Sequence, residues 1–194
     1  MWRLLREFRR SQLLDKVSVV QAGHVVLRQA AAPVDPRAIA SEEIQAIVGK
    51  MHKILDDTEH HGLSAPQIGV ALQIMIVQIT ARQLKDLGKR TVSALQMTEL
   101  RRRVFINPKL SIIDSSVVIE REGCLSVFGH SACVPRAREV CVSGLDENGE
   151  QVQLRARGWA ARIVQHEIDH LQGLLFVDKM KSRTFANDHW IDRR

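Results

Sequence analysis

The segment His166–His170, which reads HEIDH, constrains the fold of this chain more than any other stretch. Two histidines four residues apart lie on the same side of an α-helix, because each residue advances by about 100° around the axis. Both imidazole rings can therefore reach one metal ion. Glu167 lies to one side of the pair, where its carboxylate can take a proton from water without binding the metal. The pattern predicts a helix that carries the metal site of a hydrolase.

The residues around this segment predict a helix packed against a core. Apolar side chains form one broad arc that includes His170, whereas Arg162 and Asp169 lie on the polar side. Gly158 precedes the helix and Gly173 follows it, so both of its ends are marked. A histidine turned toward the core needs partners for its ring nitrogens, and a metal ion supplies one.

The rest of the chain predicts one long helix followed by several strands. Residues 81–102 are charged and predict a surface insertion that is partly helical. Asn107-Pro108 is expected to end one strand, and Asp114-Ser115 is expected to form a turn between two others. The predicted helix spans 40–58, and the predicted strands span 72–79, 104–106, 110–113, 117–119, 139–142 and 151–154. This order predicts an α+β fold with mostly antiparallel sheets packed around the late metal-binding helix.

The length of 194 residues fits one domain, and together with the HEIDH pattern it predicts a single catalytic metallohydrolase domain over residues 16–194. Residues 1–15 form a basic segment with arginines among apolar side chains, which resembles an organelle transit peptide; a short basic surface helix is the alternative. The net charge of +6 permits an anionic neighbour, but no nucleic-acid-binding motif accompanies it, so no specific nucleic-acid recognition is expected. No apolar window is long enough for a membrane span.

A catalytic metal needs a third protein ligand, and the common zinc hydrolases place it downstream of this helix. Downstream of His170 the chain has one histidine, His189, and no glutamate. Upstream, Cys124 follows Gly123 in the segment EGCLS. The three cysteines are odd in number, which argues for a reducing compartment and leaves a thiolate available as a soft ligand.

Three segments together, GLSAPQ, EGCLS and QHEIDH, resemble the three motifs of peptide deformylase, in the order of that family. The resemblance extends from about residue 20 to about residue 185. It implies a peptide deformylase-like fold and the removal of the formyl group from N-formylmethionine of newly made polypeptides. The Arg-rich start resembles the mitochondrial-type branch, which implies a mitochondrial location, with the cytoplasm as the alternative. The implied partners are N-formylmethionyl peptides near the ribosome.

The resemblance implies a metal site of three ligands, Cys124, His166 and His170. The implied cofactor is one divalent ion, Fe²⁺ in the family's usual form, with Zn²⁺, Ni²⁺ or Co²⁺ able to substitute. Glu167 is implied as the general base and then as the acid that protonates the leaving amine.

The resemblance also implies an oxyanion site and a substrate pocket. Gln67 and the backbone N–H of Leu125 are the implied oxyanion donors. The methionine side chain is expected near Trp159, Arg162 and Ile163. The implied substrate-binding residues are Gly62, His61, Gly123, Trp159, Arg162 and Ile163.

This chain departs from the family's G-x-G-x-A-A-P-Q pattern at two positions. His60 stands at the first glycine, where it could restrict the loop or change the pocket entrance, and Ser64 stands at the first alanine. Glu122 is expected to pair with Arg136 and so to brace the strand that carries Cys124.

Two other classes of protein remain as alternatives. A zinc endopeptidase would need a downstream ligand and would act on unformylated peptides. A non-catalytic, basic module associated with the ribosome or RNA would bind RNA in a salt-dependent way. Taken singly, Cys124 reads as a small buried hydrophobe and Gln67 as a loop residue; their joint occurrence carries the prediction.

Overall fold

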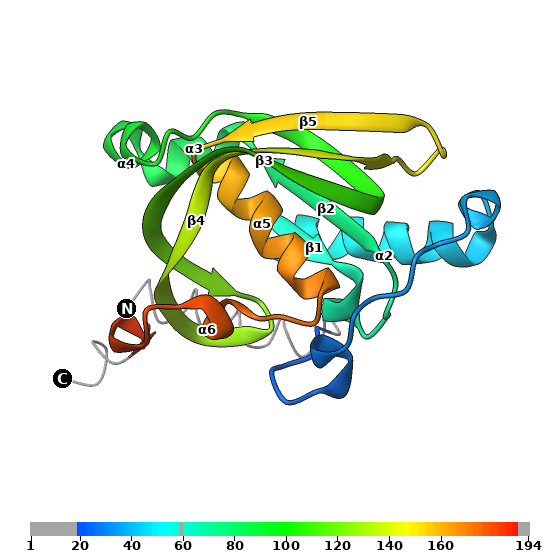
Figure 1. The fold of residues 1–194 in the computed structure, drawn as a ribbon, viewed down its shortest axis with the longest axis horizontal. Helices are drawn as coiled ribbons and strands as arrows, with labels where there is room; N and C mark the ends of the chain where they lie inside the picture. The colour runs from blue at the N-terminus through cyan, green and yellow to red at the C-terminus, as the bar shows by residue number, and fades with distance from the viewer. Residues whose placement is uncertain (1–18, 59, 190–194) are drawn as a thin grey trace.

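One curved sheet of six strands organises the described residues, which in this computed structural model are 19–58 and 60–189. The strands follow the path β1-β2-β3-β4-β5 (Figure 1), and every neighbouring pair is antiparallel. Strand β6 pairs with β4, also antiparallel. The strands are β1 (Gly62–Ser64), β2 (Ile74–Ile79), β3 (Leu100–Cys124), β4 (Val127–Leu145), β5 (Gln151–Arg157) and β6 (Ala186–Asn187). The α+β class predicted from the sequence is therefore confirmed.

Helices accompany the sheet on both faces and at its edges. The α-helices are α2 (Glu42–Thr58), α3 (Ala81–Leu87), α4 (Lys89–Ala94), α5 (Trp159–Leu171) and α6 (Phe176–Lys179). The 3₁₀ helices are η1 (Val25–Arg28), η2 (Pro36–Ala38), η3 (Ala65–Ile68) and η4 (Ser182–Thr184). The predicted helix over 40–58 corresponds to α2, and the predicted partly helical insertion corresponds to α3 and α4. None of these helices, within the described part of the chain, is long and apolar enough to cross a membrane.

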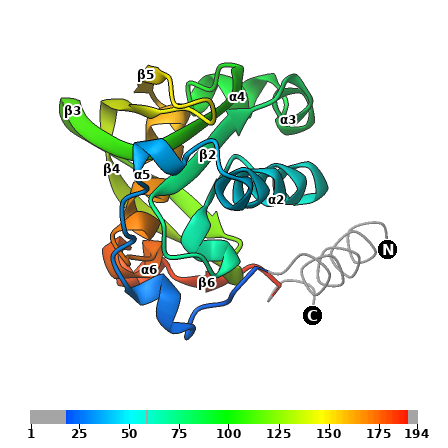
Figure 2. The same ribbon diagram turned by 90° about the vertical axis from the view of Figure 1, so that its right-hand side faces the viewer.

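Strand β2 lies between two helices, with α2 on one face and α5 on the other. Alternate residues of a strand face opposite sides. Ile74 and Ile76 pack into the cluster that contains α2, whereas Met75 and Val77 pack into the cluster that contains α5 (Figure 2). All six residues of β2 are buried. The continuous apolar run in the sequence therefore reflects a strand that is covered on both faces.

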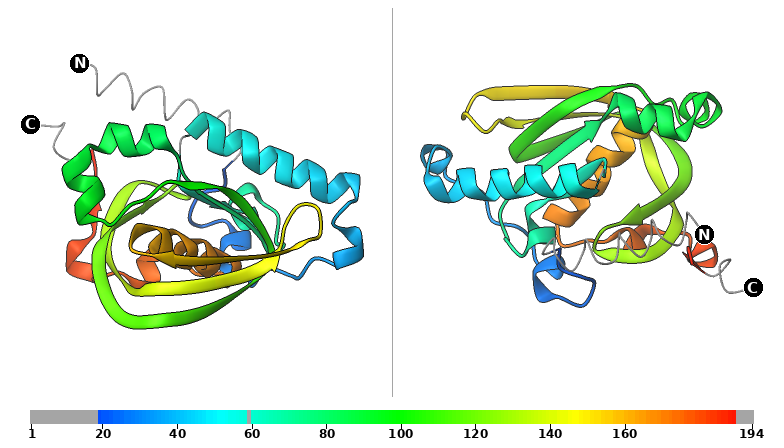
Figure 3. Two further views of the ribbon diagram at one scale, coloured as in Figure 1. Left: turned by 90° about the horizontal axis from the view of Figure 1, so that it is seen from above. Right: turned by 180° about the vertical axis from the view of Figure 1, so that it is seen from behind.

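Helix α5 lies inside the curve of the sheet, as the view from above in Figure 3 shows. It begins after Gly158 and ends shortly before Gly173, as predicted, and both glycines have positive φ, +59° and +74°. A Cβ on Gly173 would approach backbone atoms of Arg28 and Gln29 to 2.9 Å. Glycine is therefore required where the chain leaves the helix.

Strand β3 is longer than predicted, and the short strands expected between residues 104 and 119 are parts of it. Asn107 has φ of +53°, and its side chain bonds the backbone N–H and C=O of Val34 at 2.8 Å. The register slips there and again around Asp114, so each site is a bulge and not a strand end or a turn. Pro108 is tolerated because a bulge interrupts the ladder.

The predicted strand over 139–142 is likewise part of a longer strand, β4. Its hairpin with β5 is confirmed, and the loop between them spans 146–150. The basic segment 1–15 lies outside the described residues.

Candidate metal centre

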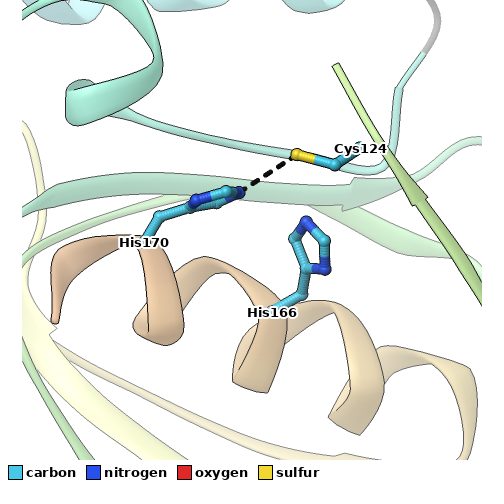
Figure 4. Close-up of side chains that lie close together, drawn as sticks. All are labelled: Cys124, His166 and His170. Atoms are coloured by element: carbon cyan, nitrogen blue, oxygen red, sulfur yellow. Dashed lines mark hydrogen bonds between the residues drawn. The ribbon is translucent and has the colours of Figure 1, made fainter. Parts of the chain in front are cut away.

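Three side chains from two distant segments converge at one point. Cys124 Sγ and one ring nitrogen each of His166 and His170 all lie within 4.8 Å of one another. Cys124 Sγ lies 3.3 Å from His170 Nε2 (Figure 4). The two imidazole rings are 4.9 Å apart and nearly perpendicular. This is the set of residues that the sequence predicts as metal ligands, and the fold brings all three together.

Local structure explains why these three meet. His166 and His170 are one turn apart on α5, so their rings project toward the same side. Cys124 is the last residue of β3, where the register with β4 shifts after Gly123. Ser126 N–H and Gln67 Nε2 both donate toward Cys124 Sγ, at 3.4 and 3.5 Å.

The two histidines differ in what holds their outer nitrogens. His166 Nδ1 lies 2.9 Å from Glu122 Oε2, which leaves its Nε2 for a metal. His170 Nδ1 is buried and has no hydrogen-bond partner among the described residues. The donor set, one sulfur and two imidazoles, suits a divalent transition metal, and the residues present fit such an ion.

Glu122 lies at the centre of a buried cluster of ion pairs and contacts His166. Arg136 binds both of its carboxylate oxygens at 2.9 Å, which shows the contact expected from the sequence. Arg162 Nη1 adds a contact at 2.6 Å. Burial opposes the charged carboxylate, yet hydrogen bonds from Arg136 and His166 outweigh it and hold the pKa of Glu122 far below its usual range.

The polar side of α5 does not face solvent. Arg162 and Asp169 are 3% and 4% exposed. Asp169 accepts from Arg136, and Arg162 also donates to the carbonyl oxygens of Val134 and Val118, each at 2.8 Å. A helical pattern cannot separate a solvated polar stripe from one that meets buried partners. Here the stripe packs on the cluster around Glu122.

Glu167 is buried beside the metal ligands, at 3% exposure. Ser64 Oγ donates to Glu167 Oε2 at 2.7 Å. Burial raises the pKa of Glu167 to about 7, against the charge of His166 and the hydrogen bond from Ser64. A carboxyl group with a pKa near neutrality can both accept and release a proton, as a general base must.

Gln67 is held in one orientation. Its Oε1 accepts from the backbone N–H of Ser64 at 2.8 Å. The Nε2 group therefore points toward Cys124 and lies 3.4 Å from Ser126 Oγ. Gln67 thus presents a donor, and not an acceptor, to the centre.

A cavity of about 90 Å³ opens onto these groups. Apart from His170, every residue predicted for the site lines it, together with His60 and Glu122. Trp159 forms one wall, in edge contact with His61 at 6.3 Å between ring centres. Arg162 lines the cavity, but its guanidinium is occupied by the contacts described above. The residues that line it besides these are Gly62, Gln67, Gly123, Cys124, Leu125, Ile163, His166 and Glu167.

Sequence reasoning missed two participants. Ser64 departs from the motif pattern, and that departure was the only signal for its contact with Glu167. Asp169 gave no signal, because its partner Arg136 is far away in sequence. His60, which stands at the first glycine of the motif pattern, has its Nδ1 3.1 Å from the carbonyl oxygen of Thr58 and is not in the ligand group. Cys133 and Cys141 are free thiols.

A family model and named relatives are similar to this chain over most of its length. Residues 16–186 match the family model for polypeptide deformylase. The mitochondrial peptide deformylase of Homo sapiens is 46% identical over 173 residues, which cover 89% of this chain and 71% of that protein. The chloroplastic/mitochondrial peptide deformylase 1A of Arabidopsis thaliana is 41% identical over 172 residues, which cover 89% of this chain and 64% of that protein.

A solved structure shares the fold. The class I type b peptide deformylase from Acinetobacter baumannii, bound to Met-Ala-Ser, superposes with a TM-score of 0.72 at 32% identity. The match covers 84% of this chain and 96% of that chain.

Proposed function

The chain belongs to the polypeptide deformylase family, and we propose that it removes the formyl group from the N-terminal methionine of newly made polypeptides, releasing formate. The observation that supports this best is the convergence of Cys124, His166 and His170 beside the buried carboxylate of Glu167. A hydrolytic site needs these two parts in contact: a metal centre and a group that moves a proton.

Cys124, His166 and His170 would hold one divalent ion, with Fe²⁺ as the proposed metal and Zn²⁺, Ni²⁺ or Co²⁺ as substitutes. When bound, such an ion polarises water and the formyl oxygen. The contact between Glu122 and His166 would keep the imidazole turned toward the ion.

Glu167 would take a proton from the water that attacks the formyl carbon. It would then give this proton to the α-amine as the C–N bond breaks. Its pKa of about 7 suits both steps, because neither protonation state is strongly favoured near neutral pH. Nε2 of Gln67 and the backbone N–H of Leu125 would donate to the oxygen that becomes negative in the tetrahedral intermediate.

The cavity would receive the substrate. Trp159, His61 and Ile163 supply an apolar wall for the methionine side chain, with the stem of Arg162 beside it. Gly62 and Gly123 would lie along the peptide backbone. The Met-Ala-Ser ligand in the Acinetobacter baumannii structure is consistent with a short N-terminal peptide in this position.

We further propose that the protein works in the mitochondrion, on chains newly made by the ribosome. The names of the human and Arabidopsis relatives support this location, and so does the Arg-rich composition of residues 1–15.

The test is formate release from formyl-Met-Ala-Ser by protein purified without oxygen. We expect release from this peptide and no cleavage of unformylated peptides. Glu167→Ala should abolish release while metal content is retained, and Cys124→Ala should lose the metal. Cleavage of an internal peptide bond would instead indicate an endopeptidase, and a near-normal rate in Glu167→Ala would refute the role of that residue.

A further inference from the structure

Strand β1 holds the carboxylate of Glu167 from two sides. Gly62 and Ser64 are two residues apart, so they face the same side of the strand, toward α5. A Cβ built on Gly62 would lie 2.4 Å from Glu167 Oε1. Ser64 Oγ lies 2.7 Å from Glu167 Oε2. One oxygen of the carboxylate therefore packs against a bare backbone, and the other meets a hydroxyl.

The hydroxyl of Ser64 has no solvent to bond, because the residue is fully buried. Among the described residues both of its acceptors belong to Glu167: the carboxylate oxygen Oε2 and the backbone carbonyl oxygen at 3.0 Å. The motif pattern described above has alanine at this position, so this chain adds one oxygen directly against the proposed general base. A buried hydroxyl pointed at a carboxylate is a strong, charge-assisted contact.

We propose that Ser64 is a positioning residue for Glu167, whose hydroxyl keeps the carboxyl group in place both before and after it takes up a proton. This inference rests on the proposed function of Glu167. A hydroxyl has one donor and two acceptor positions. While Glu167 is ionised, Ser64 donates to Oε2. When the other oxygen, Oε1, carries the proton taken from water, Oε2 becomes the carbonyl oxygen of the acid and still accepts from Ser64.

This hydrogen bond serves both halves of the proposed reaction. The carboxyl oxygen keeps a hydrogen bond in each state, so it need not move between accepting the proton from water and giving it to the amine. Alanine at the same position cannot make this bond. The backbone N–H of Ser64 also fixes Gln67, so one residue orients both the proton carrier and the proposed oxyanion donor.

A purely structural role for the hydroxyl makes different predictions. Ser64 would then only tie β1 to α5, and its loss would lower stability without a selective effect on the chemical step. Thr58 provides a matched control, because its buried hydroxyl donates to the carbonyl oxygen of Ile54 at 2.7 Å and to no carboxylate. Thr58→Val removes a buried hydroxyl and leaves Glu167 untouched.

The test compares wild type, Ser64→Ala, Ser64→Thr and Thr58→Val, each loaded with Ni²⁺, on formyl-Met-Ala-Ser. We expect Ser64→Ala to lower kcat about tenfold, with KM within about twofold and metal content unchanged, since one hydrogen bond to a charged group is lost. Ser64→Thr keeps the hydroxyl and should recover most of the rate. Thr58→Val should keep the wild-type kcat even where its melting temperature falls as far as that of Ser64→Ala.

Crystal structures of wild type and Ser64→Ala supply a second readout that does not depend on turnover. We expect the Glu167 carboxyl group to rotate or to become disordered in the alanine variant. A kcat within twofold of wild type, or a Glu167 carboxyl that stays in place, overturns the proposal. If wild type releases no formate from any formylated peptide, the proposed function fails, and the two crystal structures alone decide the role of Ser64.

Discussion

The two histidines of α5 have the same chemistry and opposite surroundings. His166 Nδ1 is bonded to Glu122, which belongs to a buried cluster with Arg136 and Arg162. His170 Nδ1 is buried with no partner among the described residues. The protein therefore fixes the orientation of one ring by hydrogen bonding and leaves the other to side-chain packing. A metal ion bound here would meet one ligand that is already oriented and one that the ion itself must help to orient.

The largest expected effect comes from removing the side chain that makes the two surroundings differ. Glu122→Ala should lower the free energy of unfolding by about 3–5 kcal/mol, because it leaves two buried guanidinium groups without their shared counter-charge. Urea unfolding of the metal-free protein measures this. Glu139→Ala, which removes a glutamate paired with the exposed Arg155, should cost no more than about 1 kcal/mol. Equal losses of unfolding free energy in the two variants would contradict this difference between a glutamate in a buried cluster and one paired with an exposed arginine.

A milder change at the same residue tests the metal site itself. Glu122→Gln keeps the shape of the side chain but removes its charge, so His166 should be held less firmly. We expect a loss of metal affinity of about 10–100-fold, measured by competition with a chelator for Zn²⁺. Glu139→Gln serves as the control and should bind Zn²⁺ like wild type. Unchanged affinity in Glu122→Gln would mean that packing alone orients His166, as it does His170.

A third change asks whether Arg162 is needed once Arg136 is present. Arg162→Met should lower the free energy of unfolding by about 1–2 kcal/mol, because two backbone carbonyls lose a donor while Arg136 still binds both oxygens of Glu122. Arg37→Met, at an exposed pair with Asp35, should have a smaller effect. A loss as large as that of Glu122→Ala would show that Arg136 cannot hold Glu122 alone.

The most gradual expected effect is a difference between the two histidines in how the stability of the metal-free protein depends on pH. Burial opposes a charged His166, but hydrogen bonds with Cys124 and Glu122 raise its pKa well above 6.5; burial and the nearby charges of His166 and Arg136 lower the pKa of His170 well below 6.5. The contribution of His166 to stability is present below pH 6.5 and is lost as the pH rises through its higher pKa. That of His170 is present above pH 6.5 and is lost as the pH falls, by up to about 1.4 kcal/mol per pH unit.

Ring signals in nuclear magnetic resonance spectra, assigned with His166→Asn and His170→Asn, measure the two pKa values directly. If both rings titrated at the same pH, the different surroundings of His166 and His170 would have no effect on their pKa values, and the expectation would be wrong.

The parts of the molecule that local pattern determines were predictable from the sequence. Helix α5 follows from its helical period and from Gly158 and Gly173, and the three ligands follow from motif order. The length of β3 did not follow, because its bulge depends on the side chain of Asn107 meeting Val34, seventy-three residues away. The burial of Asp169 did not follow either, since nothing within α5 identifies Arg136 as its partner. Contacts between distant segments decide both features.

The position of α5 inside the curve of the sheet also sets an order of events during synthesis. Chains emerge from the ribosome N-terminus first, so strands β1 to β5 are made before the helix that covers their inner face. Until residues 159–171 have emerged, the apolar side chains of β2 and β4 that pack on α5 have no partner. Over the same interval Cys124 has been made but His166 and His170 have not, so the three side chains cannot yet meet. The apolar cluster around α5 and the candidate metal centre can therefore close only late, when almost the whole chain has been made.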